Sequence, residues 1–382
     1  MDEDAGSYTV AVHGRCMIAH SFKGECFGPA QALHGCTYVV DAVVNGPKLL
    51  PGAQYLVDIC LAESALHDAL SCYNERNLDE LTEFAGENTT CERFARAVWE
   101  RVAAALPGPP ALTSMRIVVR ESDVAFVEYE RALLGVGGVP APLPALYKVS
   151  VRGRFMAARS LQGARFGEAQ QRLHGGTFIV DALFTGHTLV AGANYLIDIC
   201  LAEELVAKAI APLQQTNLNE NGGLSREVGN PTASGLARAL WTAIARGLPS
   251  GHGLRGLKLV VAEHDASIAE FEQSLSGVVA DAAVDVVADV APSPQIKATR
   301  GNPGASDEEM PEWLRSASAV LTPQSAVAAA SRGAAAPAQP TAVGTSAAGG
   351  GRHTLLARGR CMIAHSFKGA EFGPAQALHG CT

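Results

Sequence analysis

The sequence predicts an α+β protein made of tandem copies of one domain, each an antiparallel four-stranded sheet with two helices packed on one face. The first observation behind this prediction is a repeat. The segment GRCMIAHSFKGECFGPAQALHGCT starts at Gly14, recurs in altered form from Gly153 and recurs almost unchanged from Gly359. The second observation is that strand-like and helix-like periods follow one another in the same order in the first two copies.

The repeat divides the chain of 382 residues into four parts. His34 and His174 lie 140 residues apart, and Asp58 and Asp198 keep the same offset, so the first two copies are whole domains in register. Segments rich in Gly, Pro, Ala and Ser separate the copies and are typical of linkers. The predicted parts are domain A (residues 1–132), domain B (145–275), an Ala/Pro/Gly-rich linker (276–352) and a truncated third copy of domain A (353–382).

The strands of domain A are predicted from residues that alternate between two faces. Apolar side chains alternate over residues 8–12, and the β-branched stretch 37–44 (TYVVDAVV) ends at the turn residues 45–47. Near the end of the domain, residues 115–119 place apolar side chains on one face, and Glu121 continues that face. A carboxylate in this position needs a donor, which a bound ligand or a structural hydrogen bond would supply equally well.

The helices of domain A are predicted from their caps and apolar faces. Asp58 is expected to cap the first helix, and Thr89 with Glu92 is expected to form a capping box at the start of the second. Domain B repeats these elements, and Asp198 and Thr232 open its two helices. Both copies are therefore expected to have the same order of strand, strand, helix, helix and strand.

The third copy differs from the first only at Ala370 and Glu371 over the segment they share, so it is a recent copy of domain A. It holds one strand and a turn, with no helices to bury its apolar face and no partner strand for its edge. Alone it could not offset the entropy of ordering the chain. It is either disordered or the start of a third domain that continues beyond Thr382, and we favour the second interpretation.

Composition excludes several classes of function. The net charge of −8 argues against a nucleic-acid partner, which a basic patch would reveal. The acidic N-terminus has no apolar run of the kind found in signal peptides, and no window is apolar enough for a membrane helix. The nine cysteines are odd in number and mostly not shared between the copies, which favours a reducing compartment over a disulfide framework. We expect a cytoplasmic protein without membrane partners.

Three residues of domain A could bind a metal. His34 and Cys36 are two apart on a predicted strand, so their side chains share a face, and His20 ends the preceding strand. Two histidines and a cysteine leave a fourth position open, which is the arrangement of catalytic zinc sites. The spacing alone is weak, because a His-x-Cys pair is more often structural and the cysteine then acts as a small apolar residue.

Six motifs in order resemble the 6-pyruvoyl/6-carboxy-tetrahydropterin synthase family: MIAH, HG-x-x-Y, YLVDI, RNLDEL, ENTTCERFARAVWERV and VVRES. The resemblance covers residues 8–130 and 147–272. It implies tandem T-fold domains and assembly through sheet edges, either as a homo-oligomer or as a pseudo-oligomer within one chain.

The resemblance implies zinc as cofactor. The family holds zinc with three histidines, and the matching positions in domain A are His20, His34 and Cys36. In domain B, Arg159 and Gly176 take the place of two of these ligands. A permanently charged arginine is incompatible with a neighbouring zinc ion, so domain B is expected to bind none.

The catalytic and substrate-binding positions differ in how well they match. The family's cysteine falls near Ala30, and its Asp-His pair becomes Asn-Glu, so Glu75 is the remaining candidate for proton transfer in domain A. The carboxylate that anchors the pterin ring in the family is kept as Glu121 in domain A and Glu263 in domain B. Thr90 matches a substrate-binding threonine, although a helix cap would explain it as well.

Two classes of function follow from the resemblance. The first is a zinc-dependent carbon–oxygen lyase of pterin or queuosine-type biosynthesis, which acts on 7,8-dihydroneopterin triphosphate and has its metal in domain A. Family sites lie across subunit boundaries, so domain B could complete the site of domain A. The alternative is a noncatalytic pterin-binding or scaffolding protein, which the missing acid–base residues favour.

Overall fold

The computed structural model describes residues 7–106, 112–133, 144–221, 224, 229–264, 267–275, 352–357, 363–365 and 379–381. All of them belong to one of the two compact units into which the chain divides, namely Met1–Val286 together with Gly350–Thr382. Nearly all of the two predicted linker segments lies outside the described residues. The predicted domain boundaries therefore stay predictions.

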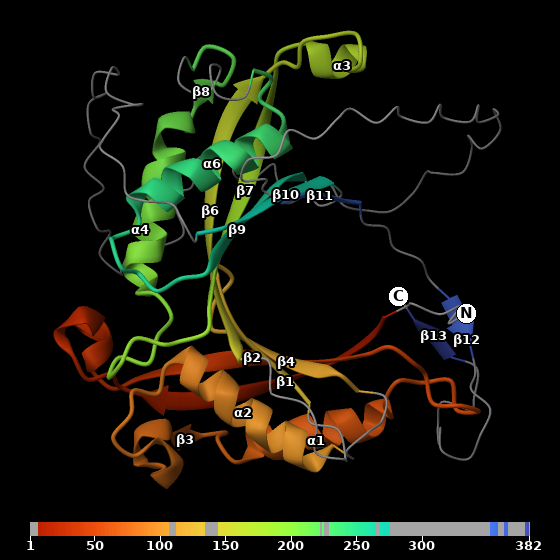
Figure 1. Cartoon of the computed structure of the whole chain (residues 1–382), viewed down its shortest axis with the longest axis vertical. Coiled ribbons are helices and arrows are strands. Elements are labelled where there is room, and N and C mark those ends of the chain that lie inside the picture. Colours follow the sequence, from red (N-terminus) through yellow and green to blue (C-terminus); the bar gives the residue numbers. More distant parts are fainter. Residues whose placement is uncertain are drawn as a thin grey trace, which may run out of the picture. The chain divides into compact units, whose positions relative to one another are not determined.

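Domain A has the predicted elements in the predicted order and adds one long strand after the last of them, β5 (Ala125–Ala132) (Figure 1). Its two helices lie side by side and pack against the same sheet. A two-residue strand, β3, which the sequence did not predict, lies parallel to the end of the first strand. The elements are β1 (Tyr8–His20), β2 (His34–Gly46), α1 (Ile59–Ser71), β3 (Arg76–Asn77), α2 (Cys91–Ala105), β4 (Ser114–Arg120) and β5 (Ala125–Ala132), with a 3₁₀ segment at Glu25–Gln31 between β1 and β2.

Domain B repeats this arrangement element by element. A short helix, α3 (Glu168–Gln171), lies where domain A has its 3₁₀ segment. The elements are β6 (Leu146–Arg159), β7 (His174–Gly186), α4 (Ile199–Ile210), β8 (Thr216–Asn217), α6 (Ala233–Gly247), β9 (Gly256–His264) and β10 (Ser267–Ser274). The predicted α+β class and the four long antiparallel strands of each copy are confirmed.

The two sheets join into one continuous sheet. The last strand of domain A, β5, pairs antiparallel with the first strand of domain B, β6, and places Tyr129 opposite Tyr147. With β11 (Arg352–Ala357) at one end, the strand order is β11-β10-β9-β7-β6-β5-β4-β2-β1-β3, and β8 pairs with β6 outside this path. Joining the sheets removes one open edge from each domain, and an open edge is a liability for a small sheet.

The same pairing is repeated after domain B. The strand β11 (Arg352–Ala357), which opens the third copy, pairs antiparallel with β10 and lies with His353 opposite Phe271. His353 and Tyr147 occupy equivalent positions in their copies, as do Phe271 and Tyr129. The register of β10 with β11 is therefore that of β5 with β6. The expectation that the third copy lacks a partner strand was wrong, because β10 provides one.

The core forms because the apolar positions of strands and helices meet. Along β1 the buried residues Val12, Cys16 and Ile18 recur at even spacing and face the helices, as a period of two requires. Phe94 and Val98 lie on the inner face of α2 and are fully buried. Truncating a buried phenylalanine to alanine typically costs about 3–5 kcal/mol, so this face fixes α2 to the sheet.

Side-chain hydrogen bonds fix the helix starts and anchor the helices. The predicted cap of α1 is confirmed, since Asp58 accepts a hydrogen bond from the backbone N–H of Cys60 at 2.9 Å. The predicted capping box of α2 was wrong. Thr90 is the N-cap and accepts from the backbone N–H of Arg93 at 3.3 Å. Glu92 is turned instead toward domain B, where it accepts from a backbone N–H.

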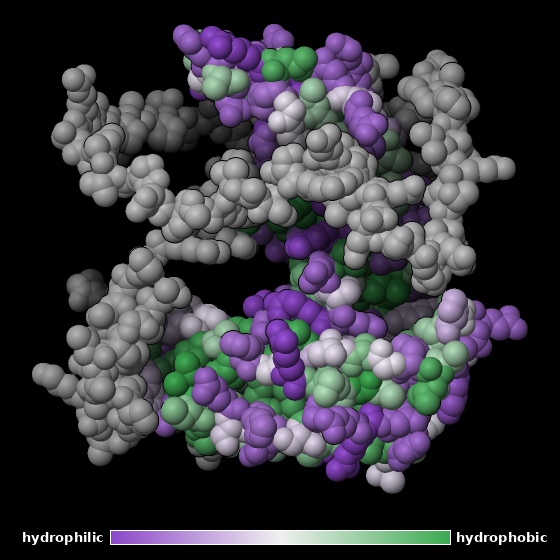
Figure 2. Space-filling model, turned by 180° about the vertical axis from the view of Figure 1, so that it is seen from behind, coloured by the Kyte–Doolittle hydropathy of each residue, from purple (hydrophilic) through white to green (hydrophobic). Residues whose placement is uncertain are grey.

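Exposed apolar residues recur at equivalent positions of the two copies. Met17 and Met156 are 49% and 48% exposed, and Leu33 and Leu173 follow the same pattern at 64% and 62%. Figure 2 shows hydrophobic residues gathered in patches among hydrophilic ones on the visible face of domain A. Within the described ranges, no helix has the length and apolar character needed to cross a membrane.

Candidate functional site

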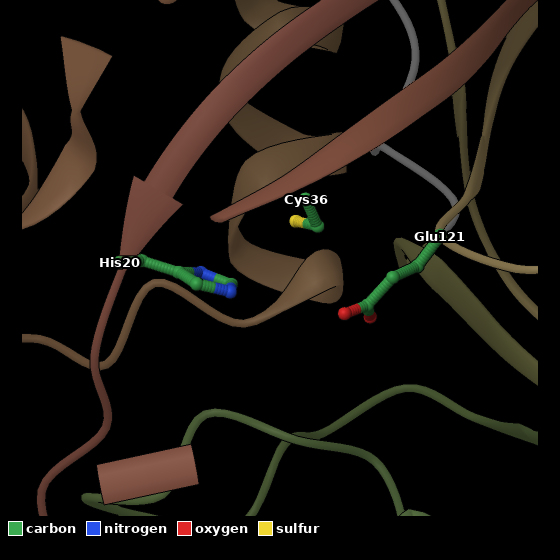
Figure 3. Close-up of side chains that lie close together, drawn as sticks. All are labelled: His20, Cys36 and Glu121. Carbon is green, nitrogen blue, oxygen red and sulfur yellow. The ribbon is translucent and has the colours of Figure 1, made fainter. Parts of the chain in front are cut away.

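Three side chains with metal-binding atoms converge near the end of β1. The ligand atoms of His20, Cys36 and Glu121 all lie within 4.8 Å of one another, and no other such group occurs in the described part of the chain. His20 is the last residue of β1, Cys36 lies on the neighbouring strand β2, and Glu121 directly follows β4. Figure 3 shows the three side chains pointing toward a common space.

His20 is held in the form that binds a metal. It is 1% exposed, and its Nδ1 lies 3.0 Å from the carbonyl oxygen of Thr89. A carbonyl can only accept a hydrogen bond, so Nδ1 carries the proton and Nε2 has the lone pair. Nε2 is buried without a hydrogen-bond partner. Burial also lowers the pKa of His20 and favours the neutral ring. A buried, unpartnered lone pair beside a thiol and a carboxylate fits a zinc ion.

His34 lies at the edge of this group. It pairs with His20 across β1 and β2, and the two ring centroids are 4.5 Å apart. Its Nδ1 lies 2.8 Å from the carbonyl oxygen of Ala32, which again leaves Nε2 as the acceptor. The structure thus joins two of the three expected metal residues directly with Glu121, which we expected to bind substrate, and places the third beside them.

Two residues that the sequence analysis missed surround the carboxylate. The Cys91 sulfur lies 3.4 Å from Oε2 of Glu121 and 3.4 Å from the hydroxyl of Tyr38, which is fully buried. Burial, with a contribution from Glu121, raises the pKa of Cys36 to about 11, while a hydrogen bond from Tyr38 opposes the shift. Tyr38 could have been predicted from the sequence. It follows Cys36 by two residues on the same strand, and residues two apart on a strand share a face. Cys91 had no such signal.

A cavity of about 150 Å³ lies next to the group, and both domains line it. Glu121, Cys91 and Phe27 belong to its domain A wall, and Tyr195 and Ile197 belong to its domain B wall. The rings of Phe27 and Tyr195 approach to 5.8 Å between centroids. Cys26 and Ala30, near the position of the family's cysteine, also line it. The cavity is mostly apolar, and three acidic residues, Glu92, Glu121 and Asp198, also line it, which suits a flat heterocycle with polar edges.

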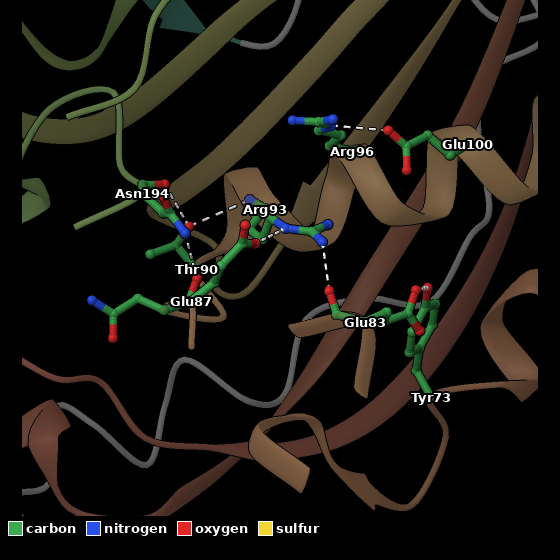
Figure 4. Close-up of polar contacts among 9 residues, drawn as sticks. Tyr73, Glu83, Glu87, Thr90, Arg93, Arg96, Glu100 and Asn194 are labelled. Atoms are coloured by element: carbon green, nitrogen blue, oxygen red, sulfur yellow. Dashed lines mark hydrogen bonds and ion pairs between the residues drawn. The ribbon is translucent and has the colours of Figure 1, made fainter. Parts of the chain in front are cut away.

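Hydrogen bonds hold the domain B wall in place over the start of α2. The Thr90 hydroxyl donates to the backbone carbonyl of Asn194 at 2.7 Å (Figure 4). The Asn88 side chain donates to the backbone carbonyl of Gly192 at 3.1 Å. Thr90 thus caps α2 and also contacts domain B. It lines the cavity as well.

Glu92 completes this junction. Its Oε1 accepts from the backbone N–H of Leu196 at 2.9 Å, and the residue is 5% exposed. Burial raises the pKa of Glu92 to about 7, partly offset by that backbone hydrogen bond. The cavity therefore has a carboxyl group that can exchange a proton near neutral pH.

Glu75, the expected proton-transfer residue, lies elsewhere. Its backbone has a left-handed conformation with φ of 58°, and its N–H donates to the carbonyl of Met17 at 2.7 Å. The side chain is exposed and does not line the cavity. The equivalent Gln215 of domain B adopts the same turn and bonds Met156 in the same way, so this turn belongs to the fold.

Among the described residues of domain B there is no comparable group. Arg159 stands at the position of His20, and its guanidinium is paired with Glu263, which we expected to bind substrate. The carboxylate of Glu263 is thus already bonded within the domain.

The family model described as 6-pyruvoyl tetrahydropterin synthase matches residues 9–132 and 148–274. The two matches cover well over half of the chain. The chain belongs to this family. The recognition from the motifs is confirmed, and because the family matches twice, so are the tandem copies with their T-fold.

Solved structures show more distant likenesses. The chain is 19% identical to 6-pyruvoyl tetrahydropterin synthase from Caenorhabditis elegans, over 31% of this chain and 92% of that one, with a TM-score of 0.29. The synthase from Plasmodium falciparum is 14% identical over 34% and 98%, also with 0.29. Uricase from Arthrobacter globiformis is 7% identical over 68% and 83%, with 0.38. No curated protein matches the chain in sequence.

Membership makes this chain a pterin-related T-fold protein of a lyase family. Within it, domain A brings together His20, Cys36 and Glu121, which could hold a metal ion, beside a cavity, whereas the matching site of domain B is filled by an ion pair.

Proposed function

We propose that domain A is a zinc-dependent pterin lyase, which acts on 7,8-dihydroneopterin triphosphate in the cavity between the two domains. The observation that carries this proposal is the unpartnered Nε2 of His20, placed with a thiol and a carboxylate beside a cavity that both domains line. Family membership supports the substrate class and the type of reaction.

His20, His34 and Cys36 hold the zinc ion in this proposal. Two neutral imidazoles and a thiolate are ligands that zinc prefers, and they leave a position for substrate. The carbonyl of Thr89 orients His20, and the hydroxyl of Tyr38 supports the sulfur of Cys36. When bound, zinc polarises the oxygens of the pterin side chain and makes the neighbouring C–H more acidic.

Glu121 and Glu92 act on the substrate itself. A carboxylate facing the 2-amino-pyrimidinone edge of a pterin accepts two N–H bonds, each worth about 1.5–3 kcal/mol when the acceptor is charged. The thiol of Cys91 helps to orient Glu121 for this contact. Glu92, with its pKa near neutrality, is the cavity group suited to hold or release the proton that moves. Glu75 has no role in this cavity.

Domain B completes the site in the same proposal. Tyr195 and Ile197 cover the cavity from the B side. Their loop is fixed because Thr90 donates a hydrogen bond to it and Glu92 accepts one from it. The chain then acts as a pseudo-oligomer, in which one copy supplies the chemistry and the other supplies a wall.

The test is to measure zinc content and turnover of dihydroneopterin triphosphate with the purified full chain. We expect about one zinc per chain, which Cys36→Ala abolishes along with turnover. Cys60→Ala, at an exposed cysteine on α1, is the matched control and keeps both. Wild-type protein without zinc after growth in zinc-rich medium would refute the metal site. Pterin binding without any turnover would replace the lyase with a binding protein.

A further inference from the structure

Arg159 of domain B occupies the place that His20 has in domain A. Each is the last residue of the first strand of its domain, and each lies opposite a histidine at the start of the next strand. Arg159 is 4% exposed. A guanidinium buried to this extent needs partners of opposite charge or hydrogen-bond acceptors. Its contacts therefore identify the groups that surround the site in domain B.

The guanidinium makes the same contact in domain B that His20 makes in domain A, and it also makes a second contact. Its Nη1 donates to the carbonyl oxygen of Pro231 at 2.5 Å, and Pro231 is the equivalent of Thr89, whose carbonyl accepts from His20. Its Nη2 donates to Glu263, the equivalent of Glu121. Arg159 therefore reaches from the carbonyl to the carboxylate, across the space that the metal-binding atoms border in domain A.

The other residues around the carboxylate have changed together with Arg159. Gly176, Phe178 and Ala233 of domain B have no polar side-chain atoms, and the guanidinium lies over the ring of Phe178 at 5.2 Å from its centroid. A Cβ on Gly176 would lie 3.4 Å from Oε1 of Glu263, so a side chain at this position would start beside the carboxylate. The equivalents in domain A are Cys36, Tyr38 and Cys91.

A metal ion and Arg159 cannot share this site. Both would occupy the space beside Glu263, and two cations at a few ångströms repel each other strongly in a buried environment. Arginine also keeps its charge when buried, so it supplies permanently the positive charge that a metal ion supplies only when bound. Oε2 of the carboxylate is then paired with Arg159 without any ligand.

We propose that Arg159 is a built-in cation that takes the place of the metal ion in domain B and keeps Glu263 from any ligand. Domain B then binds no metal, because the side chain of Arg159 fills the site. This inference concerns domain B alone and stands whether or not domain A is a lyase.

The test restores metal ligands in domain B of the full chain. It uses the Cys36→Ala background, in which domain A has lost its thiol ligand. The probe is Co²⁺, measured by equilibrium dialysis and by the absorption that a cobalt–thiolate bond produces. Arg159→His with Gly176→Cys copies the His-His-Cys set of domain A, and we expect bound cobalt to rise from near zero to about one per chain. Gly176→Cys alone, with Arg159 kept, is the matched control and should bind none.

The outcomes separate this inference from the proposed function. Cobalt bound by Gly176→Cys with Arg159 intact would overturn the inference, and so would a folded double variant that binds none. Failure of the proposed function would instead show as wild-type domain A without metal. A second measurement does not depend on the double variant: Arg159→Met and Glu263→Gln should each lower the melting temperature, and together they should lower it by less than the sum. Additive shifts would contradict the pairing.

Discussion

Domains A and B have one fold and two different sites. Asp58 and Asp198 cap equivalent helices, and Trp99 and Trp241 donate to equivalent carbonyls at 2.8 Å in both copies. Around the carboxylate after the fourth strand, however, a histidine, two cysteines and a tyrosine have been replaced by an arginine and three residues without polar side-chain atoms. Packing and capping thus constrain the scaffold, while the site can change as a unit without disturbing it.

In the proposed function, domain B contributes to the site of domain A although it binds no metal itself. Tyr195 and Ile197 line the cavity of domain A, and their loop accepts the hydrogen bonds of Thr90 and Asn88. None of these contacts involves Arg159 or Glu263. Domain B can therefore line the cavity of domain A whatever occupies its own site.

The largest effect is expected when the metal site of domain A is broken. His20→Ala removes the buried nitrogen that no hydrogen bond satisfies, and we expect zinc to fall from about one per chain to near zero and turnover to fall at least about 100-fold. The matched change in domain B is His174→Ala, which should leave both unchanged. Metal analysis and a turnover assay check the pair. Equal loss of zinc and turnover in the two variants would show that domains A and B do not differ in metal binding.

The second comparison is between the two carboxylates. Glu121→Gln should weaken pterin binding by about 10- to 100-fold, because a charge-assisted acceptor becomes a neutral one. Glu263→Gln should leave pterin affinity unchanged and lower stability instead, by about 1–3 kcal/mol, because it leaves the buried Arg159 guanidinium without its counter-charge. Pterin titration by fluorescence and thermal unfolding measure the two effects. Weakened binding in Glu263→Gln would mean that domain B still binds pterin.

The sequence was informative wherever a periodic pattern decided the structure. The alternation over residues 8–12 and the cap at Asp58 come from local physics, and the structure bears both out. The second helix shows the limit. Local rules placed a capping box at Thr89 and Glu92, but Glu92 bonds a backbone N–H of the other domain, and no local rule contains that partner.

The candidate site was predicted in part for the same reason. Cys36 and His20 could be placed together, because paired strands bring their ends together. Glu121 joins them only because β4 pairs with β2, and Cys91 reaches it from the start of a helix. These contacts arise from tertiary packing, and the spacing of the residues along the chain does not encode them.

A third comparison exchanges one hydroxyl group. Tyr38→Phe removes the hydrogen bond to Cys36 and copies the residue of domain B, and we expect the affinity of domain A for Co²⁺ to fall about 10-fold. The reciprocal change, Phe178→Tyr, should create no metal binding in domain B, because Arg159 remains. Competition with a chromophoric chelator measures both affinities. Unchanged affinity in Tyr38→Phe would exclude support of the metal ligand by this hydroxyl.

The last prediction concerns the junction between the domains. Burial raises the pKa of Glu92 to about 7, above the ordinary value for a glutamate. Between about pH 4.5 and 7 the folded chain then binds more protons at this residue than the unfolded chain does. The stabilisation from the protonated form is complete below the unfolded pKa and is lost as the pH rises through about 7. Its full size is about 3 kcal/mol, because each pKa unit is worth about 1.4 kcal/mol.

Glu92→Gln should remove this dependence, because an amide does not titrate and its oxygen can still accept from the N–H of Leu196. Urea unfolding at several values between pH 4.5 and 7.5 should therefore give a flatter stability profile for Glu92→Gln than for wild type. Domain B has Ser234 at the equivalent position, so Ser234→Ala is the matched control and should keep the wild-type slope. Parallel profiles for wild type and Glu92→Gln would show that this carboxyl titrates alike in the folded and unfolded chain, and the junction would then be held by the bonds of Thr90 and Asn88 without a contribution from its charge.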